Sequence, residues 1–141
     1  MASKQQMSGM RGVYLAAAEL ARRGFTVSPT TRSAAGADLL ITDDSCRNAY
    51  SIQVKTITGG RDYWLLNSKA GAIASDSHLY LFVDIRDREH TVEYFIVPSK
   101  KVSKHYYVNR QRGGNIWYGI MREDVEKYQI CLKPKRRIRG S

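Results

Sequence analysis

The amino-acid sequence predicts a single α/β domain built around a central mixed β-sheet. The first observation is length, because 141 residues is the size of one ordinary domain. The second is composition: 43% of the residues are hydrophobic and 26% are charged, which is typical of a globular protein and excludes a mainly disordered chain. The third is that helical and strand-like patterns alternate along the chain without an internal repeat.

The amino-terminal part of the chain predicts a helix followed by strands. Small and apolar side chains recur at helical spacing at Val13, Ala16 and Leu20, and Gly24 is placed to end the helix. Farther on, apolar and polar residues alternate with a period of two, as they do in a half-buried strand. The predicted elements are a helix over residues 9–23, an extended segment over 25–27, a loop over 30–36, and two neighbouring strands over 37–42 and 50–56 that are expected to form a hairpin.

Two continuous apolar runs mark the second half of the chain, over residues 79–85 and 92–97. Both runs are short and rich in β-branched and aromatic residues, so they predict core strands. Shorter patterns around them predict smaller elements. These are a strand over residues 63–66, an alanine-rich helix over 69–75, a helix over 100–105, a strand over 116–120 and a helix over 123–128.

Positive charge is concentrated at the carboxyl end. The formal net charge is +10 and the pI is near 9.8, and residues 100–141 hold 12 basic but only 3 acidic side chains. We therefore divide the chain into one domain over residues 1–132 and a flexible basic tail over 133–141. Such a tail can attract a polyanion, and both nucleic acid and an acidic membrane surface fit that description. The alternative is that the tail only aids solubility. Its basic residues are Lys133, Lys135, Arg136, Arg137 and Arg139.

The sequence carries no sign of a membrane span or of a metal-binding cysteine framework. No apolar run reaches the ~18 residues that a span needs, and no signal-peptide pattern is present. Cys46 and Cys131 lie far apart without Cys/His spacing, so both are expected to be reduced. We therefore expect a cytoplasmic protein that does not bind membranes.

Three polar residues on the two neighbouring strands are candidates for chemistry. Because side chains alternate in a strand, Gln53 and Lys55 share one face while Ile52 and Val54 face the core. Asp38 opens an otherwise apolar strand, where its charge needs a cation or a donor, such as Lys55 or a metal ion. The alternative is that turn amides satisfy Asp38, and that Gln53 and Lys55 lie on the solvent face of an edge strand.

The order of helix, loop, Asp38, fourteen intervening residues and Gln53-Val54-Lys55 resembles the PD-(D/E)-x-K nuclease superfamily. Within it, the segment Gly36-Ala37-Asp38-Leu39-Leu40-Ile41 is similar to the first half of the Holliday-junction-resolvase-like branch. The resemblance covers residues 9–97. It implies a restriction-endonuclease-like three-layer sandwich, with the central sheet flanked by helices.

The resemblance also implies metal-dependent phosphodiester hydrolysis. In the family pattern the first acid, here Asp38, and the middle position, here Gln53, bind Mg²⁺ or Mn²⁺, while the lysine, here Lys55, stabilises developing charge. The family has Asp or Glu at the middle position, and the Gln53 amide oxygen is a weaker ligand.

The resolvase branch also places a glutamate in the first helix, for which Glu19 is the candidate. Its alternative role is an ion pair with Arg22 or Arg23 on the helix surface. The loop residues Arg32 and Ser33 are expected near the phosphate backbone, as the basic tail is.

We therefore expect a magnesium- or manganese-dependent DNA endonuclease, acting as a homodimer. The alternative is a non-catalytic nucleic-acid-binding protein that keeps the fold, and Gln53 is the residue that divides the two. A nuclease acting on RNA and an assembly protein with an acidic partner remain open as well. The aromatic pairs Tyr63-Trp64 and Tyr106-Tyr107 could stack on bases or pack in the core, and Trp64 is expected in the core.

Overall fold

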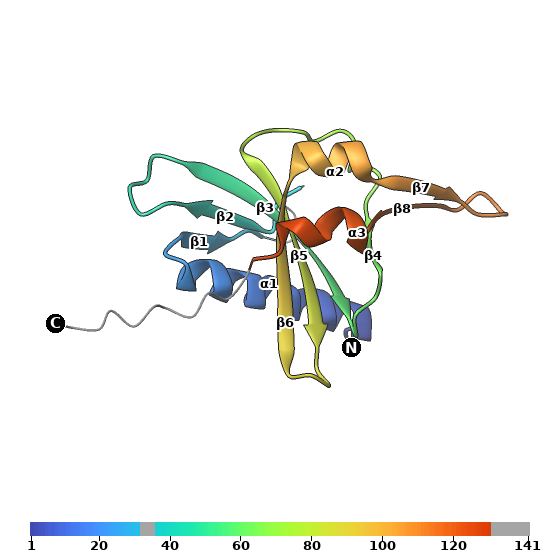
Figure 1. Cartoon of the computed structure of the whole chain (residues 1–141), viewed down its shortest axis with the longest axis horizontal. Coiled ribbons are helices and arrows are strands. Elements are labelled where there is room, and N and C mark those ends of the chain that lie inside the picture. The colour runs from blue at the N-terminus through green and yellow to red at the C-terminus, as the bar shows by residue number, and fades with distance from the viewer. Residues whose placement is uncertain (32–35, 131–141) are drawn as a thin grey trace.

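The computed structural model describes residues 1–31 and 36–130, and these form two β-sheets with helices packed against them (Figure 1). The helices are α1 (Lys4–Arg22), α2 (Ser99–His105) and α3 (Arg122–Val125), and a 3-10 turn, η1 (Glu126–Tyr128), follows α3. The strands are β1 (Thr26–Pro29), β2 (Leu39–Thr42), β3 (Ala49–Thr58), β4 (Tyr63–Leu66), β5 (His78–Arg86), β6 (Thr91–Pro98), β7 (Tyr107–Arg110) and β8 (Ile116–Met121).

The larger sheet is mixed, with the strand order β1-β2-β3-β5-β6. The pairs β1–β2, β2–β3 and β5–β6 are antiparallel, and β3–β5 is parallel. The α/β class with a central mixed sheet is therefore confirmed, and so is the hairpin expected after the first helix. The parallel pair is possible because the chain makes a long crossover through β4 before it returns in β5.

A second sheet, with the order β4-β8-β7, was not expected from the sequence. The helix predicted over residues 69–75 is wrong, because residues 69–72 form turns and residues 73–75 are irregular. The Lys69 backbone N–H donates to Asn67 Oδ1 at 3.0 Å, which closes a turn in place of a helix. Gly71 lies close against the ring of Tyr106.

The first helix starts at Lys4, earlier than predicted, because a capping box precedes it. The Gln6 backbone N–H donates to Ser3 Oγ at 3.2 Å, and the Ser3 backbone N–H donates to Gln6 Oε1 at 2.9 Å. The helix ends at Arg22, and Gly24 adopts φ +98° directly after it.

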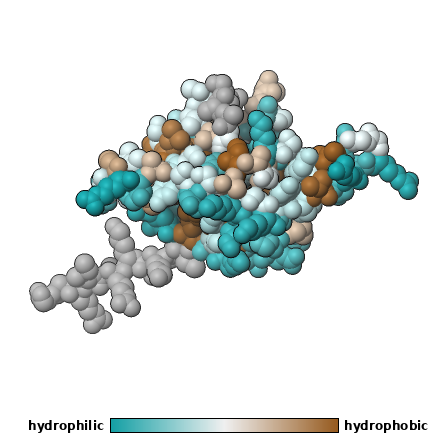
Figure 2. All heavy atoms as spheres, turned by 90° about the horizontal axis from the view of Figure 1, so that it is seen from above, coloured by the Kyte–Doolittle hydropathy of each residue, from teal (hydrophilic) through white to brown (hydrophobic). Residues whose placement is uncertain are grey.

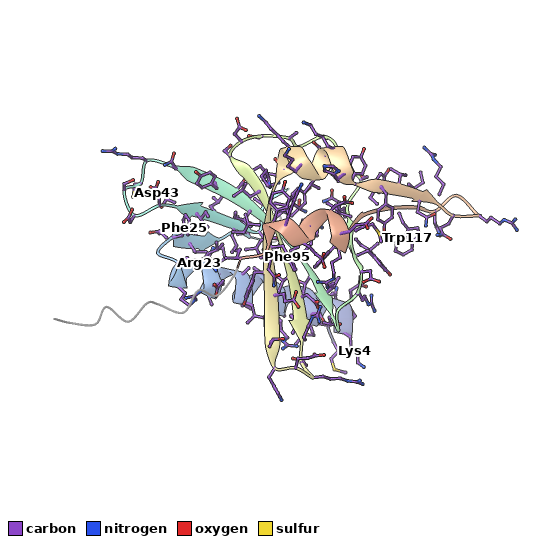
Figure 3. All side chains as sticks on the ribbon, viewed as in Figure 1. Lys4, Arg23, Phe25, Asp43, Phe95 and Trp117 are labelled. Atoms are coloured by element: carbon purple, nitrogen blue, oxygen red, sulfur yellow. The ribbon has the colours of Figure 1, made fainter. Side chains whose placement is uncertain are left out.

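The larger sheet buries a hydrophobic cluster on each of its faces. On one face, Ala16 and Leu20 of α1 pack with Ile52 and Val54 of β3. On the other face, Trp64 and Phe95 belong to a cluster that joins the two sheets, and Phe95 lies in the middle of the molecule (Figure 3). The core position predicted for Trp64 is confirmed: it is fully buried, and its Nε1 donates to the Val83 carbonyl at 3.1 Å.

Helix α1 approaches β3 most closely at Gly12, which leads to a prediction about two glycines. A Cβ at Gly12 would collide with the Thr56 side chain, whereas a Cβ at Gly9 would meet nothing within 4 Å. Gly9→Ala is therefore expected to stabilise the protein by about 0.5–1 kcal/mol, the usual gain of Ala over Gly in a helix. Gly12→Ala is expected to destabilise it by about 1–3 kcal/mol through overpacking.

Thermal or urea unfolding of the two variants measures this difference. Thr56→Ala in the Gly12→Ala background should recover part of the lost stability, because it removes the nearest atom, Thr56 Oγ1. Equal stabilisation by both alanines would contradict the close packing of α1 on β3.

A buried ionic network fastens the smaller sheet to the larger one. Asp84 is fully buried and accepts hydrogen bonds from Arg122 Nη2 at 2.6 Å and from Arg86 Nε at 3.0 Å. Glu93 adds ion pairs of 2.9 Å to Arg86 and 3.5 Å to Arg122. The Arg122 guanidinium also lies 5.0 Å from the Trp64 ring centroid.

Two further expectations concern membrane crossing and the carboxyl end of the chain. In residues 1–31 and 36–130, no helix combines the length and the apolar character needed to cross a membrane. The predicted basic tail over residues 133–141 lies outside the described residues, as does Cys131.

Candidate functional site

Strands β2 and β3 bring Asp38, Gln53 and Lys55 to one face of the larger sheet. Asp38 directly precedes β2, and its backbone N–H donates to the Ile52 carbonyl at 2.8 Å, so it lies opposite the start of the Gln53-Val54-Lys55 segment. Ile52 and Val54 point toward α1. Alternation therefore places Gln53 and Lys55 on the face away from α1.

The Asp38 carboxylate is tied to the backbone of β3 by one of its oxygens. Asp38 Oδ2 accepts a hydrogen bond of 2.7 Å from the Val54 backbone N–H. The bond forms because β2 starts only at Leu39, so the strand itself offers Val54 no carbonyl at this point. Asp38 Oδ1 has no hydrogen-bond partner within residues 1–31 and 36–130. A backbone N–H thus satisfies one oxygen, and the other has no partner in the part of the chain that the structure describes.

Lys55 is half-buried beside this carboxylate. Burial lowers the pKa of the Lys55 ammonium, and the charge of Asp38 opposes that shift only in part. Among the residues that the structure describes, no carboxylate lies within ion-pair distance of Lys55. A partly desolvated cation without a bound anion is suited to receive the negative charge of a phosphate.

Gln53 completes the group. Its exposed fraction is 8%, and its side chain makes no hydrogen bond within the described part of the chain. Its amide atoms are not among the buried polar atoms that lack a partner, so they reach the surface of the site, where a ligand can contact them. Asp38 Oδ1 and Gln53 Oε1 together offer the hard oxygen ligands that Mg²⁺ prefers, with one carboxylate in place of the family's two.

Glu19 does not join these three residues. Its carboxylate accepts from Arg22 Nη2 at 2.7 Å and from Arg23 Nε at 3.0 Å. These bonds, that of Arg22 above all, lower the pKa of Glu19 although burial opposes the shift. Glu19 lies on α1, which packs on the other face of the sheet. The geometry therefore favours the ion-pair role over a place beside Asp38.

The sequence analysis missed a serine–histidine pair next to Gln53. Ser51 and His78 are cross-strand partners in the parallel pair β3–β5, and Ser51 Oγ lies 2.7 Å from His78 Nδ1. His78 is 4% exposed, its Nε2 has no partner among the described residues, and burial lowers its pKa. The sequence shows that Ser51 and Gln53 lie on the same face of their strand. It does not show that β5 pairs with β3 on the side away from β2, which is what brings His78 beside Ser51.

A cavity of about 430 Å³ adjoins the site over β1, β2 and β3. Leu40 and Ser51 line it, two residues from Asp38 and Gln53 on the same face of the sheet. Several other lining residues carry hydroxyl groups, which can donate to phosphate oxygens. They are Thr26, Ser28, Thr42 and Ser77.

The remaining candidates for nucleic-acid contact lie outside the described residues. They are the loop residues Arg32 and Ser33 and the tail residues Lys133, Lys135, Arg136, Arg137 and Arg139.

Comparison of the sequence with protein-family models and with curated proteins gives no match.

Proposed function

We propose that the chain is a Mg²⁺- or Mn²⁺-dependent endonuclease that hydrolyses phosphodiester bonds in DNA. The observation that carries this proposal is the position of Asp38, Gln53 and Lys55 on one face of adjacent strands. Among the described residues, a carboxylate oxygen without a hydrogen-bond partner, a largely buried glutamine and an ammonium without an ion-pair partner lie there beside the cavity. This donor set suits a hard cation and a phosphodiester together.

The residues would divide the work of hydrolysis among them. Asp38 Oδ1 and Gln53 Oε1 would hold the metal ion, which when bound supplies a Lewis acid and an activated water. The bond from Val54 to Asp38 Oδ2 keeps the carboxylate in place. Lys55 stabilises the charge that develops on the phosphoryl oxygens, and its partial burial strengthens that effect.

The arrangement of the elements supports the restriction-endonuclease-like sandwich that we propose for the fold. Helix α1 covers one face of the mixed sheet, while α2 and the smaller sheet pack against the other. We further propose a homodimer, because cutting both strands of a duplex is simplest with two sites related by a twofold axis.

A non-catalytic DNA-binding protein is the second candidate. This candidate is favoured because the site supplies little negative charge to hold a metal ion: of Asp38, Gln53 and Lys55, Asp38 alone is a carboxylate. No group of three His, Cys, Asp or Glu side chains suited to a metal ion occurs in the part of the chain that the structure describes.

The direct test of the proposal is cleavage of linear and branched duplex DNA. Cutting is expected with Mg²⁺ or Mn²⁺ and not with EDTA. Binding of the same DNA without cutting, at any metal concentration, would favour the second candidate. Cutting of RNA but not of DNA would contradict the proposal that DNA is the substrate.

Titration of Mn²⁺ by calorimetry tests the role of position 53. Gln53→Glu is expected to bind the ion at least about fivefold more tightly, because one unit charge at 4 Å contributes ~1 kcal/mol even in water. Ala49→Glu serves as the control, since it adds the same charge at an exposed position of β3 about 13 Å away. Equal affinities for wild type and Gln53→Glu would exclude residue 53 from the metal site.

A further inference from the structure

The smaller sheet exposes aromatic side chains on the face that does not pack in the core. Ile120 and Trp64 point inward, so alternation places Trp117, three residues before Ile120, and Tyr63, next to Trp64, outward. Tyr107 is paired with Gly119 and shares this outward face. We name the outward side chains Tyr63, Tyr107 and Trp117 the aromatic platform.

Gly119 allows the platform to be flat. The ring of Tyr107 lies across Gly119, so close that a Cβ there would come within 2.6 Å of the ring carbon Cζ. Burial raises the pKa of the Tyr107 hydroxyl, and the nearby Tyr63 hydroxyl raises it further. The Tyr107 ring is therefore uncharged near neutral pH, and it does not repel an anion.

The platform continues into a projecting hairpin that carries positive charge. Figure 1 shows β7 and β8 extending from the body at the end opposite to β1 and β2. Residues 110–116, at its tip, include Arg110 and Arg112 but no acidic residue. Figure 2 shows hydrophilic side chains at the tip of the hairpin, and Figure 3 shows Trp117 on the hairpin, away from the core around Phe95.

We propose that the aromatic platform and the basic hairpin tip bind unpaired nucleotides of a nucleic acid. Aromatic rings stack on bases of any sequence, while arginines contact the phosphates between them. The platform supplies the rings and the tip supplies the cations, in a chain whose formal charge is +10. This site goes beyond the proposed cleavage, because binding there requires no metal ion.

A second copy of the chain is a less suitable occupant of this surface. Symmetric docking of two hairpins would bring Arg110 and Arg112 of one copy near those of the other, without an acidic residue at either tip to offset them. A polyanion offsets this charge directly.

Two neighbouring residues of β8 provide a matched test. Trp117 is 47% exposed on the platform, and Ile116 is 44% exposed on the opposite face of the same strand. Binding of a fluorescein-labelled oligothymidylate is measured by anisotropy in EDTA, so that the result does not depend on cutting. Trp117→Ala is expected to weaken binding roughly 5- to 150-fold, and Trp117→Phe to restore most of it. Ile116→Ala is expected to change binding little.

An abasic oligomer of the same length separates stacking from charge. The wild type should bind it more weakly than oligothymidylate, and Trp117→Ala should not weaken that binding further. Equal losses for Ile116→Ala and Trp117→Ala, or equal affinity for both oligomers, would overturn the proposal. So would a change from dimer to monomer in Trp117→Ala, by sedimentation, with unchanged affinity for the oligonucleotide.

Discussion

Replacing Asp38 by asparagine is expected to reduce metal-dependent DNA cleavage by about 10²–10³-fold while leaving the fold intact. The asparagine Oδ1 can still accept the hydrogen bond that Asp38 Oδ2 receives from Val54. It cannot supply the negative charge that holds a hard cation. Asp38→Ala is expected to lose activity as well, but also about 1–3 kcal/mol of stability, because the Val54 N–H is then left without its acceptor.

Lys55→Met is the companion variant, since it keeps most of the aliphatic stem and removes the ammonium. It is expected to reduce cleavage at saturating metal by a similar factor, and Lys101→Met on the exposed side of α2 should have no effect. Rates are measured from single-turnover nicking of plasmid DNA, and stability from urea unfolding. Cleavage that survives both Asp38→Asn and Lys55→Met would refute the assigned site.

Replacing Asp84 by alanine is expected to destabilise the protein by about 3–5 kcal/mol, the usual result of removing one partner from a buried ion pair. Asp84 is fully buried, and the side chain of its partner Arg122 is 11% exposed. Without Asp84, Arg122 keeps its hydrogen bonds to the Arg61 carbonyl, but its remaining ion pair among the described residues is the 3.5 Å contact with Glu93. The Gly60 N–H also loses its acceptor. The smaller sheet should therefore detach more readily from β5.

Asp87 provides the matched control for Asp84, three residues farther along the chain. Its side chain is 70% exposed and forms an ion pair with Arg11, whose side chain is 50% exposed. Asp87→Ala should shift the urea midpoint little, because solvent screens such pairs. The measurement is the midpoint and slope of urea unfolding. Equal midpoints for Asp84→Ala and Asp87→Ala would show that the buried network does not hold the two sheets together.

Local sequence patterns predicted most of the larger sheet. The apolar runs that became β5 and β6 bury their side chains on both faces, so composition alone identified them. In the smaller sheet, the strands predicted over residues 63–66 and 116–120 are confirmed as β4 and β8. Strand β7 was missed, because it has four residues and three of them are exposed. The helix predicted over residues 69–75 failed because seven residues cannot hold a helix without tertiary contacts, and here the contact favours turns around Gly71.

The candidate site was predicted in part. Alternation in β3 placed Gln53 beside Lys55, and the short turn after β2 placed Asp38 near both. The sequence could not decide between the two roles of Glu19. An ion pair with Arg22 or Arg23 is possible on any helix surface, and a place in the site depends on which face of the helix packs against the sheet. The serine–histidine pair Ser51–His78 depends on parallel pairing across a long crossover, which no local pattern encodes.

The sequence by itself determined the α/β class, the hairpin that carries Asp38, Gln53 and Lys55, and the excess of positive charge. These features follow from periodicity, turn residues and composition, which act over a few residues. Only the tertiary structure decided which face of the sheet is open, where Tyr63, Tyr107 and Trp117 lie, and how Asp84 joins the sheets. Each of these depends on pairing between segments far apart in the chain, where long-range packing selects among arrangements that local propensities leave equal.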